Sequence, residues 1–547
     1  MAIRDLRPIR AAQWNEHTAR HLLNRAGFGI PDARVQQLAQ LSPKSAVDSF
    51  LHFEPTEWSP APDFLVPAES RRDRRQANQE MTQSERRKNR QEIAKRERAA
   101  VRQLKAWWLE RMATTEHPLE EKMTLFWHGH FATSAQKVRS SQSNYELNDT
   151  FRAHATGNFK QLTLAVGQSP TMLRYLDNHR NVKGKPNENW ARELMELFTM
   201  GVGNYTEEDI KEAARAFTGW TFNDDGFVYR ERVHDWGMKT FLGTTGNLDG
   251  WHAVDAIFDQ PATAEFIARK LWRFFAYEDP DKAIVQGLAA EFRANNYDLK
   301  PLLRTIFLSR TFYSKEAIGT QVKSPAQFIV RVAHDLDTNP VPYSAMARFT
   351  AQLGQDLYYP PNVKGWDGGK AWINANTLLL RYNMPPALIR ASADANLTQN
   401  NTDMMMVSDQ KTSKTNQQTL RDSFQQYMRS LEPQQRRLIR AQLSESANSR
   451  ERHSMMRAAM DGSPMIATWS PKRVFSQLAF TTGGECIDAL STRFLGRKVS
   501  NEQRKILANS LGVPVDMDAP LSASHLSPQH MRATLRMLLS MAEYQLC

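Results

Sequence analysis

Cysteine is scarce in this sequence, with only two among 547 residues, Cys486 and Cys547. They form no C-x-x-C pair, so they exclude a disulfide framework and indicate neither a redox dithiol nor a thiolate metal site. Long hydrophobic runs are missing as well. No segment approaches the length needed to cross a bilayer, and the N-terminal residues lack the apolar stretch of a secretory signal. We therefore expect a cytoplasmic protein without a membrane span.

The short motifs of common enzyme classes are also missing. The sequence has no H-E-x-x-H, P-loop or G-x-S-x-G motif, and no dinucleotide-binding glycine fingerprint in a usable context. These absences exclude the standard hydrolase, kinase and Rossmann classes. Any chemistry must therefore come from side chains in less common combinations.

Positive charge is in excess, with a formal net charge of +12. Half of it lies in residues 71–98, where nine Arg and two Lys accompany five acidic residues. Apolar side chains at helical spacing begin only at Val101, Leu104 and Trp107, which predicts a solvated helix that docks at its C-terminal end. Binding of nucleic acid or anionic lipid is the alternative, but interleaved acids and the lack of aromatics before Trp107 favour the solvated helix.

Apolar residues at helical spacing recur along most of the chain, separated by glycine, proline and N-cap residues. The predicted fold is mainly α, a multi-helix globular body with one small inserted β-hairpin around "GFVYRERVHDWGMKTFLG". The expected organisation is N-terminal helices in 1–60, a basic solvated helical insertion in 61–105, a central helical core in 106–395, a polar flexible insertion with a helix in 396–465, and C-terminal helices packing on the core in 466–547.

The stretch "LFWHGHFATS" places two histidines, His128 and His130, among large aromatic residues. Two such rings can share a metal ion on extended backbone, where alternate side chains point the same way, but they diverge on a helix. The apolar spacing upstream favours a helix as far as the histidines, and Gly129 weakens that helix between them. The pair is therefore expected near a helix end.

The segment "KPNENWARELMELFTMG" carries two carboxylates, Glu193 and Glu196, on one strip beside its apolar face. Carboxylates on such a boundary are partly desolvated, which suits them for acid–base work or for binding a hard cation. Pairing of Arg192 with Glu188 or Glu196, at the i, i+4 spacing, is the structural alternative.

A glycine-bounded segment, "RVHDWGMKTFLG", holds His234, Asp235 and Lys239, a setting typical of functional loops. The histidine is a candidate ligand or general base, and the aspartate a candidate partner that orients its ring. A turn in which Asp235 caps its own backbone is the structural alternative.

Taken together, the motifs identify a family resemblance. The segments "HLLNRAGFG", "LFWHGHFATS", "PNENWARELMELFTMGVGNYTEEDIKEAARAFTGW", "HDWGMKTFLG" and "PPNVKGWDGGKAWIN" resemble the bacterial domain of unknown function 1800 family. The resemblance covers about residues 20 to 390 and resumes in the last eighty or so. It implies a mostly helical fold with the polar signature residues named above, but no established activity. It also implies frequent export and frequent encoding beside a sulfatase-like family.

We therefore expect a metal-dependent enzyme, hydrolytic or oxidative. In this hypothesis His128, His130 and His234 donate nitrogen ligands, Glu193 and Glu196 donate oxygens or act as general base, and Asp235 and Lys239 complete the catalytic set. Such a mixed nitrogen and oxygen set suits a divalent ion of Fe, Mn, Zn or Cu. The alternatives are a noncatalytic helical scaffold for the sulfatase-like protein and a nucleic-acid-binding protein that uses residues 71–98.

Overall fold

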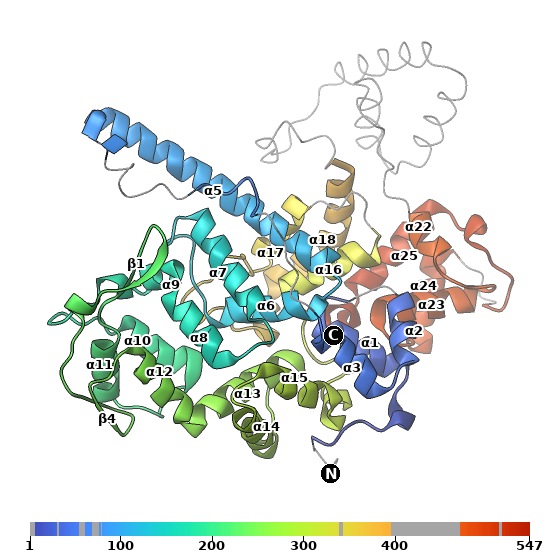
Figure 1. Ribbon diagram of the computed structural model, residues 1–547. Helices are drawn as coiled ribbons and strands as arrows, with labels where there is room; N and C mark the ends of the chain where they lie inside the picture. Colours follow the sequence, from blue (N-terminus) through green and yellow to red (C-terminus); the bar gives the residue numbers. More distant parts are fainter. Residues whose placement is uncertain are drawn as a thin grey trace. The chain divides into compact units, whose positions relative to one another are not determined.

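A computed structural model describes residues 6–29, 32–53, 61–67, 76–77, 79–337, 343–394, 471–512 and 517–547. This part of the chain is mainly α-helical, as predicted, and its strands form two short hairpins (Figure 1). The polar insertion predicted at 396–465 lies outside the described residues. Within them, no helix is both long enough and apolar enough to cross a membrane.

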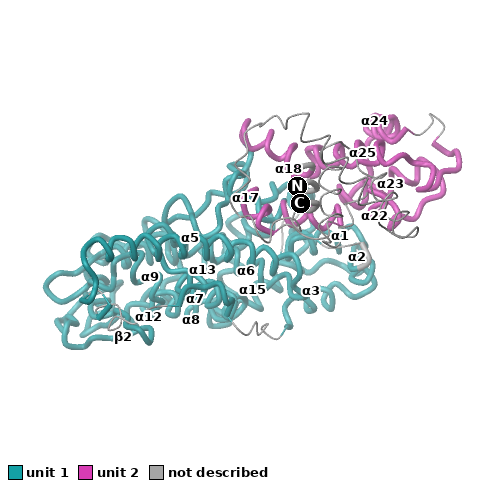
Figure 2. The backbone as a smooth tube through the Cα atoms, turned by 90° about the horizontal axis from the view of Figure 1, so that it is seen from above, with its two compact units in different colours: residues 1–328, 350–373, 546–547 teal, residues 329–349, 374–545 magenta. Residues whose placement is uncertain are grey.

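The chain divides into two compact units (Figure 2). Unit 1 comprises Met1–Phe328, Thr350–Ile373 and Leu546–Cys547, and unit 2 comprises Ile329–Phe349 and Asn374–Gln545. The α-helices of unit 1 are α1 (Glu16–Ala26), α2 (Asp32–Ala39), α3 (Pro43–Leu51), α5 (Gln83–Thr114), α6 (Pro118–His130), α7 (Ser141–Ala153), α8 (Phe159–Gln168), α9 (Pro170–Tyr175), α10 (Asn189–Glu193), α11 (Glu207–Ala216), α12 (Gly250–Asp259), α13 (Pro261–Phe275), α14 (Lys282–Ala294) and α15 (Leu299–Leu308).

Short helices and turns complete unit 1. They are η1 (Ala11–Gln13), η2 (Asn178–Arg180), η3 (Leu194–Thr199), η4 (Glu231–Val233), η5 (Arg310–Tyr313) and η6 (Gly369–Trp372). Two helices, α16 (Pro325–Asp335) and α17 (Tyr343–Gln352), run from one unit into the other along the chain. Unit 2 also contains α18 (Ala375–Asp394), α22 (Pro471–Ser476), α23 (Gly483–Leu495), α24 (Asn501–Leu511), η7 (Ala523–His525), α25 (Pro528–Ser540) and η8 (Ala542–Gln545).

Helix α6 lies in the core of unit 1 and is buried on all sides. Every residue from Leu119 to His128 is buried, including three charged ones, Glu120, Glu121 and Lys122. Pro118 occupies the first turn, where its missing N–H costs no hydrogen bond. A helix that is covered all round can bring polar side chains into the core only if each finds a partner there.

The strands form two separate antiparallel hairpins rather than one. Strand β1 (Trp220–Asn223) pairs with β2 (Gly226–Tyr229), and β3 (Lys239–Phe241) pairs with β4 (Thr244–Gly246). The sequence prediction joined residues of β2 and β3 into one hairpin, because both are rich in aromatic and β-branched residues. Instead, the segment between β2 and β3 forms an irregular connection that carries His234 and Asp235.

The basic segment forms the long helix α5, as predicted for its described residues. Its buried residues begin at Ala100 and include Leu104 and Trp108, whereas none of residues 83 to 99 is buried. Thr82 caps the helix by accepting the backbone N–H of Glu85 at 3.3 Å, and the Glu85 carboxylate accepts the N–H of Thr82 in return. Figure 1 shows the first half of α5 extending beyond the other helices of unit 1.

Candidate functional site

The two histidines at the C-terminal end of α6 point to different places. Because both lie on an α-helix, which turns by about 100° per residue, positions two residues apart face nearly opposite directions. The helix continues through Gly129 and ends at His130. His128 and His130 are both buried, and each ring lies in its own environment.

His128 is enclosed by aromatic rings and the loop that follows α17. Its ring lies edge-on to Trp108 and Tyr358, with centroids 5.0 and 5.1 Å away. Its Nε2 accepts the backbone N–H of Tyr358 at 3.0 Å. Tyr358 has a φ of 64°, which is strained for a residue with a large side chain. Burial lowers the pKa of His128 to about 3, so the ring is neutral and holds this strained loop in place.

His130 forms a pair with Lys270 of α13. Its Nε2 lies 2.9 Å from the carbonyl oxygen of Phe198 and must therefore carry the hydrogen, which leaves Nδ1 as an acceptor. Lys270 Nζ donates to this Nδ1 at 2.9 Å and also lies 3.4 Å from the carbonyl oxygen of Leu197. Burial, followed by the charge of Lys270, lowers the pKa of His130 far below its ordinary value.

The two carbonyl groups that meet this pair belong to the π-helix η3. In an α-helix the N–H of Gly201 would bond the carbonyl of Leu197, but here it bonds Met195 at 2.9 Å. Met200 N–H also reaches the Met195 carbonyl, at 2.9 Å, which is the wider spacing of a π-turn. The carbonyls of Leu197 and Phe198 therefore face the donors of Lys270 and His130.

Lys270 has an unusual electrostatic environment. Burial, followed by the charges of Arg273 and Lys364, lowers its pKa to about 7. Within the described ranges no carboxylate lies within ion-pair distance of its Nζ. Its ammonium group also lies 5.0 Å from the centroid of the Phe266 ring. A half-buried lysine without an acidic partner is a nitrogen base that can exchange a proton near neutral pH.

Glu193 and Glu196 lie close to each other, at the junction of α10 and η3. Burial and the neighbouring Glu196 raise the pKa of Glu193. Glu196 accepts a hydrogen bond from the Tyr205 hydroxyl at 3.2 Å. Arg192 pairs with Glu188 and Glu207, at 3.1 and 2.9 Å, so one of the predicted structural pairs is present and does not involve Glu196.

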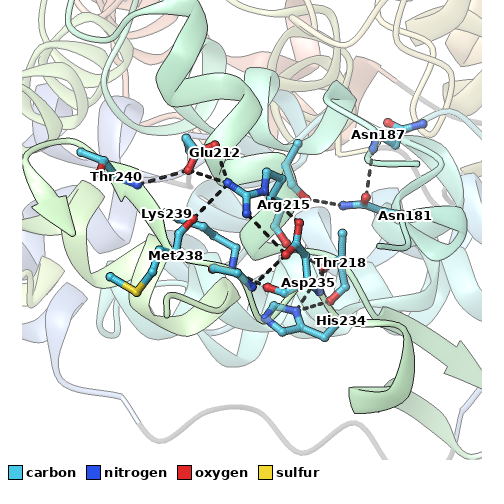
Figure 3. A network of polar contacts seen from close by, with 12 residues as sticks. Asn181, Asn187, Glu212, Arg215, Thr218, His234, Asp235, Met238, Lys239 and Thr240 are labelled. Carbon is cyan, nitrogen blue, oxygen red and sulfur yellow. Dashed lines mark hydrogen bonds and ion pairs between the residues drawn. The ribbon is translucent and has the colours of Figure 1, made fainter. Parts of the chain in front are cut away.

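His234 and Asp235 lie in the connection between β2 and β3, and Lys239 is the first residue of β3 (Figure 3). His234 Nδ1 lies 2.9 Å from the carbonyl oxygen of Thr218 and donates to it. Its Nε2 is buried and has no hydrogen-bond partner among the described residues. Burial lowers the pKa of His234, so this ring too is neutral.

The Asp235 carboxylate bonds Arg215 and the backbone of its own loop, and it does not orient the His234 ring. Its carboxylate accepts Arg215 Nε at 2.8 Å and the backbone N–H of Gly237 at 2.9 Å. The hydrogen bond from Arg215 lowers the pKa of Asp235 to about 2. Lys239 Nζ donates to the carbonyl oxygens of Asp235 and Gly237. A Cβ at Gly237 would lie 2.8 Å from the Arg215 guanidinium, so a side chain at this position would displace that group.

The structure does not gather the predicted metal ligands. His128 bonds a backbone N–H, His130 bonds Lys270 and a carbonyl, and His234 bonds the Thr218 carbonyl. Across the described ranges, no three His, Cys, Asp or Glu side chains are placed to hold a metal ion. A divalent ion at His128, His130, His234, Glu193 and Glu196 therefore remains a prediction from the sequence, without support in these contacts.

A second buried polar cluster lies toward the N-terminal end of α6. Glu121 accepts Trp108 Nε1 at 2.8 Å, Arg111 Nε at 2.9 Å and Arg152 Nε at 2.6 Å. Although burial alone would raise the pKa of Glu121, the charge and hydrogen bond of Arg152 keep it low. Arg152 also donates to Asn148 at 2.7 Å. We call Glu121, Arg111 and Arg152 the arginine–glutamate cluster.

Sequence reasoning did not identify Lys270. The apolar spacing of the segment around it indicates an amphipathic core helix, with Lys270 opposite the apolar face. One signal was present: Phe266, Lys270 and Phe274 follow i, i+4, i+8 spacing, which places aromatic residues along the supposed solvent face. Aromatic residues on both faces of a helix indicate that neither face is fully solvated, so a lysine between them is desolvated.

Comparison with known proteins gives a family and no activity. The profile of the family described as "Protein of unknown function (DUF1800)" matches residues 21–546. The chain belongs to this family. Neither a curated protein nor a solved structure matches it.

Proposed function

We propose that this protein is an enzyme whose reactive group is the Lys270 amine, working with His130 on a carbonyl compound. The observation that carries the proposal is the 2.9 Å contact between Lys270 Nζ and His130 Nδ1, in a place where no described carboxylate pairs with the amine. A lysine paired with an acid stays charged, whereas one held by a neutral ring and desolvated is a nucleophile near neutral pH.

The hydrogen bonds of the pair leave the amine ready to react. In its neutral form Lys270 has two hydrogens, which are directed to His130 Nδ1 and to the Leu197 carbonyl oxygen. Its lone pair then remains available. As the C–N bond forms on a substrate carbonyl carbon, the C=O double bond opens and one amine proton passes by way of Nδ1 to the oxygen, which gives a carbinolamine. The second amine proton follows to the same oxygen, the C–O bond breaks, water leaves, and a C=N bond results.

The charges near the pair favour an anionic substrate. Arg273 and Lys364 are both exposed and are the charged groups that act most strongly on Lys270. Lys364 pairs with Asp367 at 2.9 Å, but both partners are exposed, so this pair is weak and salt-sensitive. A carboxylate or phosphate on the substrate gains favourable interaction with these cations, and a neutral carbonyl compound does not.

Trapping the imine tests the proposal. Incubation with glyoxylate and cyanoborohydride at neutral pH reduces any C=N bond to a stable secondary amine, which peptide mass spectrometry locates. We expect preferential labelling of Lys270 over the other lysines and weaker labelling by propanal, which has no charge. Lys270→Arg abolishes the label at this position. His130→Gln lowers its rate, because the relay is lost while the side chain stays polar. Labelling spread over exposed lysines and absent from Lys270 contradicts the proposal.

A noncatalytic role is the second candidate, favoured by the loop in Figure 3. The contacts of Asp235 and Lys239 fix a short loop that presents Trp236 and Met238, which are 48% and 65% exposed. Large apolar side chains on a fixed loop are typical of residues that anchor a protein partner. The partner that the family resemblance implies is the sulfatase-like protein.

Calorimetric titration of the two purified proteins tests this second role. Trp236→Ala with Met238→Ala is expected to weaken binding at least tenfold, because exposed aromatic anchors contribute much of an interface. Ile506→Ala in unit 2, where Ile506 is 49% exposed, is the matched control and leaves affinity unchanged. No binding by the wild-type protein, or an equal loss in the control, removes the support for this role.

A further inference from the structure

The exposed half of α5 separates its charges by face. With about 100° of rotation per residue, five basic residues fall within one sector about 100° wide, whereas Glu85, Glu92 and Glu97 fall outside it. We call the five residues the basic stripe: Arg87, Lys88, Lys95, Arg98 and Arg102. At about 1.5 Å per residue, the stripe is roughly 22 Å long.

Every member of the basic stripe is exposed. None of the five forms an ion pair or a side-chain hydrogen bond with any residue that the structure describes. Some exposed cations elsewhere do pair with acidic neighbours: Lys211 pairs with Glu208 at 3.2 Å, and Lys137 pairs with Asp177 at 2.7 Å. The stripe therefore keeps its positive charge uncompensated within this part of the chain.

We propose that the basic stripe binds the phosphate backbone of double-stranded nucleic acid. The helix extends beyond the other helices of unit 1 (Figure 1), and an α-helix fits the major groove of a duplex. Stripe cations that contact phosphates release the counterions condensed there, which drives association. The polar Ser84 and Gln91 complete the same face, and Gln91 can approach the groove without desolvating an apolar side chain.

An anionic membrane is the competing surface, and the stripe fits it less well. Helices that lie in a membrane interface bury tryptophan, phenylalanine or leucine on the face that enters the lipid. The sector that holds the stripe contains no aromatic or leucine residue between Gln83 and Arg102. Binding to lipid would therefore rest on charge alone, without the apolar contribution that holds such helices in place.

The test measures the binding of a fluorescent DNA duplex by the full chain at several salt concentrations. With five contacts, log K is expected to fall against log salt with a slope of about −4.5, or roughly 500-fold between about 50 and 200 mM. The triple variant Lys88→Gln, Lys95→Gln, Arg98→Gln keeps two contacts, and its expected slope is about −1.8. The matched control, Arg86→Gln, Arg90→Gln, Arg96→Gln, removes the same charge from the other faces of α5 and leaves the slope unchanged.

Three outcomes overturn the proposal. The first is a wild-type slope shallower than about −2, because fewer than three phosphate contacts are then made. The second is an equal loss in the stripe and control variants, because total charge and not its placement then matters. The third is binding to phosphatidylserine vesicles without binding to the duplex, which assigns the stripe to lipid. Circular dichroism of both variants shows whether α5 remains helical.

Discussion

The two ends of α6 contact desolvated cations in opposite ways. Toward the N-terminal end, Arg111 and Arg152 meet the Glu121 carboxylate, so charge is neutralised by charge. At the C-terminal end, Lys270 meets the neutral His130 ring and backbone carbonyls. Although burial alone would lower it, Glu121 raises the pKa of Arg152, whereas burial lowers the pKa of Lys270 to about 7. The comparison separates a structural cluster from the pair that we propose to be reactive.

Removing the Glu121 carboxylate disrupts the arginine–glutamate cluster and has the largest expected effect on stability. Glu121→Gln removes the carboxylate that two buried guanidinium groups share and leaves Arg111 with the distant Glu120, at 3.9 Å, and Arg152 with the exposed Asp149. Breaking a buried pair in this way costs about 3–5 kcal/mol. We expect the urea midpoint to fall accordingly at an unchanged m-value. A midpoint within experimental error of the wild type contradicts the structural role of the arginine–glutamate cluster.

Replacing Lys270 tests the low pKa of this lysine through the pH dependence of the free energy of unfolding. Its pKa is about 7 in the folded chain against an ordinary value of 10.5, so between these values the unfolded chain binds more protons. The free energy of unfolding of the wild type therefore rises with pH relative to Lys270→Met, and below about pH 7 the difference is constant. Urea midpoints of both proteins from about pH 6 to pH 10 measure it. A difference that does not vary with pH contradicts the assignment.

The ion pairs of Arg192 at the surface allow the stability contribution of solvated charges to be compared with that of buried charges. Arg192→Ala removes contacts to Glu188 and Glu207, both exposed, and an exposed pair is worth at most about 1 kcal/mol. The expected change in the urea midpoint is small and disappears in high salt. A loss of stability as large as that of Glu121→Gln shows that burial does not determine how much these ion pairs contribute to stability.

Addition of a divalent metal ion has the smallest expected effect on stability. A ligand that binds only the folded state at a hundred times its Kd stabilises it by about 2.7 kcal/mol. Because His128, His130 and His234 are each engaged elsewhere, Zn²⁺ is expected to leave the melting temperature unchanged. A rise that is present in the wild type and absent in His130→Gln restores the metal centre predicted from the sequence.

Periodicity was enough to predict the fold class and the docking of α5, because both follow from local spacing. The apolar residues from Ala100 onward mark where that helix becomes buried, and the aromatic run before His128 marks α6. The paired hairpins were not predictable in the same way, because β2 and β3 find partners on either side of the segment that joins them.

The candidate site depends on contacts that no local pattern contains. Lys270 is 140 residues from His130 in the sequence, and Phe198 is 68 residues from it. The π-turn that exposes the Leu197 and Phe198 carbonyls is itself a departure from regular spacing. The sequence pattern predicts His130 as a metal ligand but contains no signal that pairs it with Lys270.

The most direct test of the account is the pKa of Lys270. Acetic anhydride acetylates only neutral amines, so the labelling of each lysine over a pH series, measured by peptide mass spectrometry, gives its titration. We expect half-maximal labelling of Lys270 near pH 7 and of the buried Lys122 near pH 8, as burial lowers its pKa to about 8. A midpoint for Lys270 at the ordinary lysine value of 10.5 would contradict the proposed reactive amine.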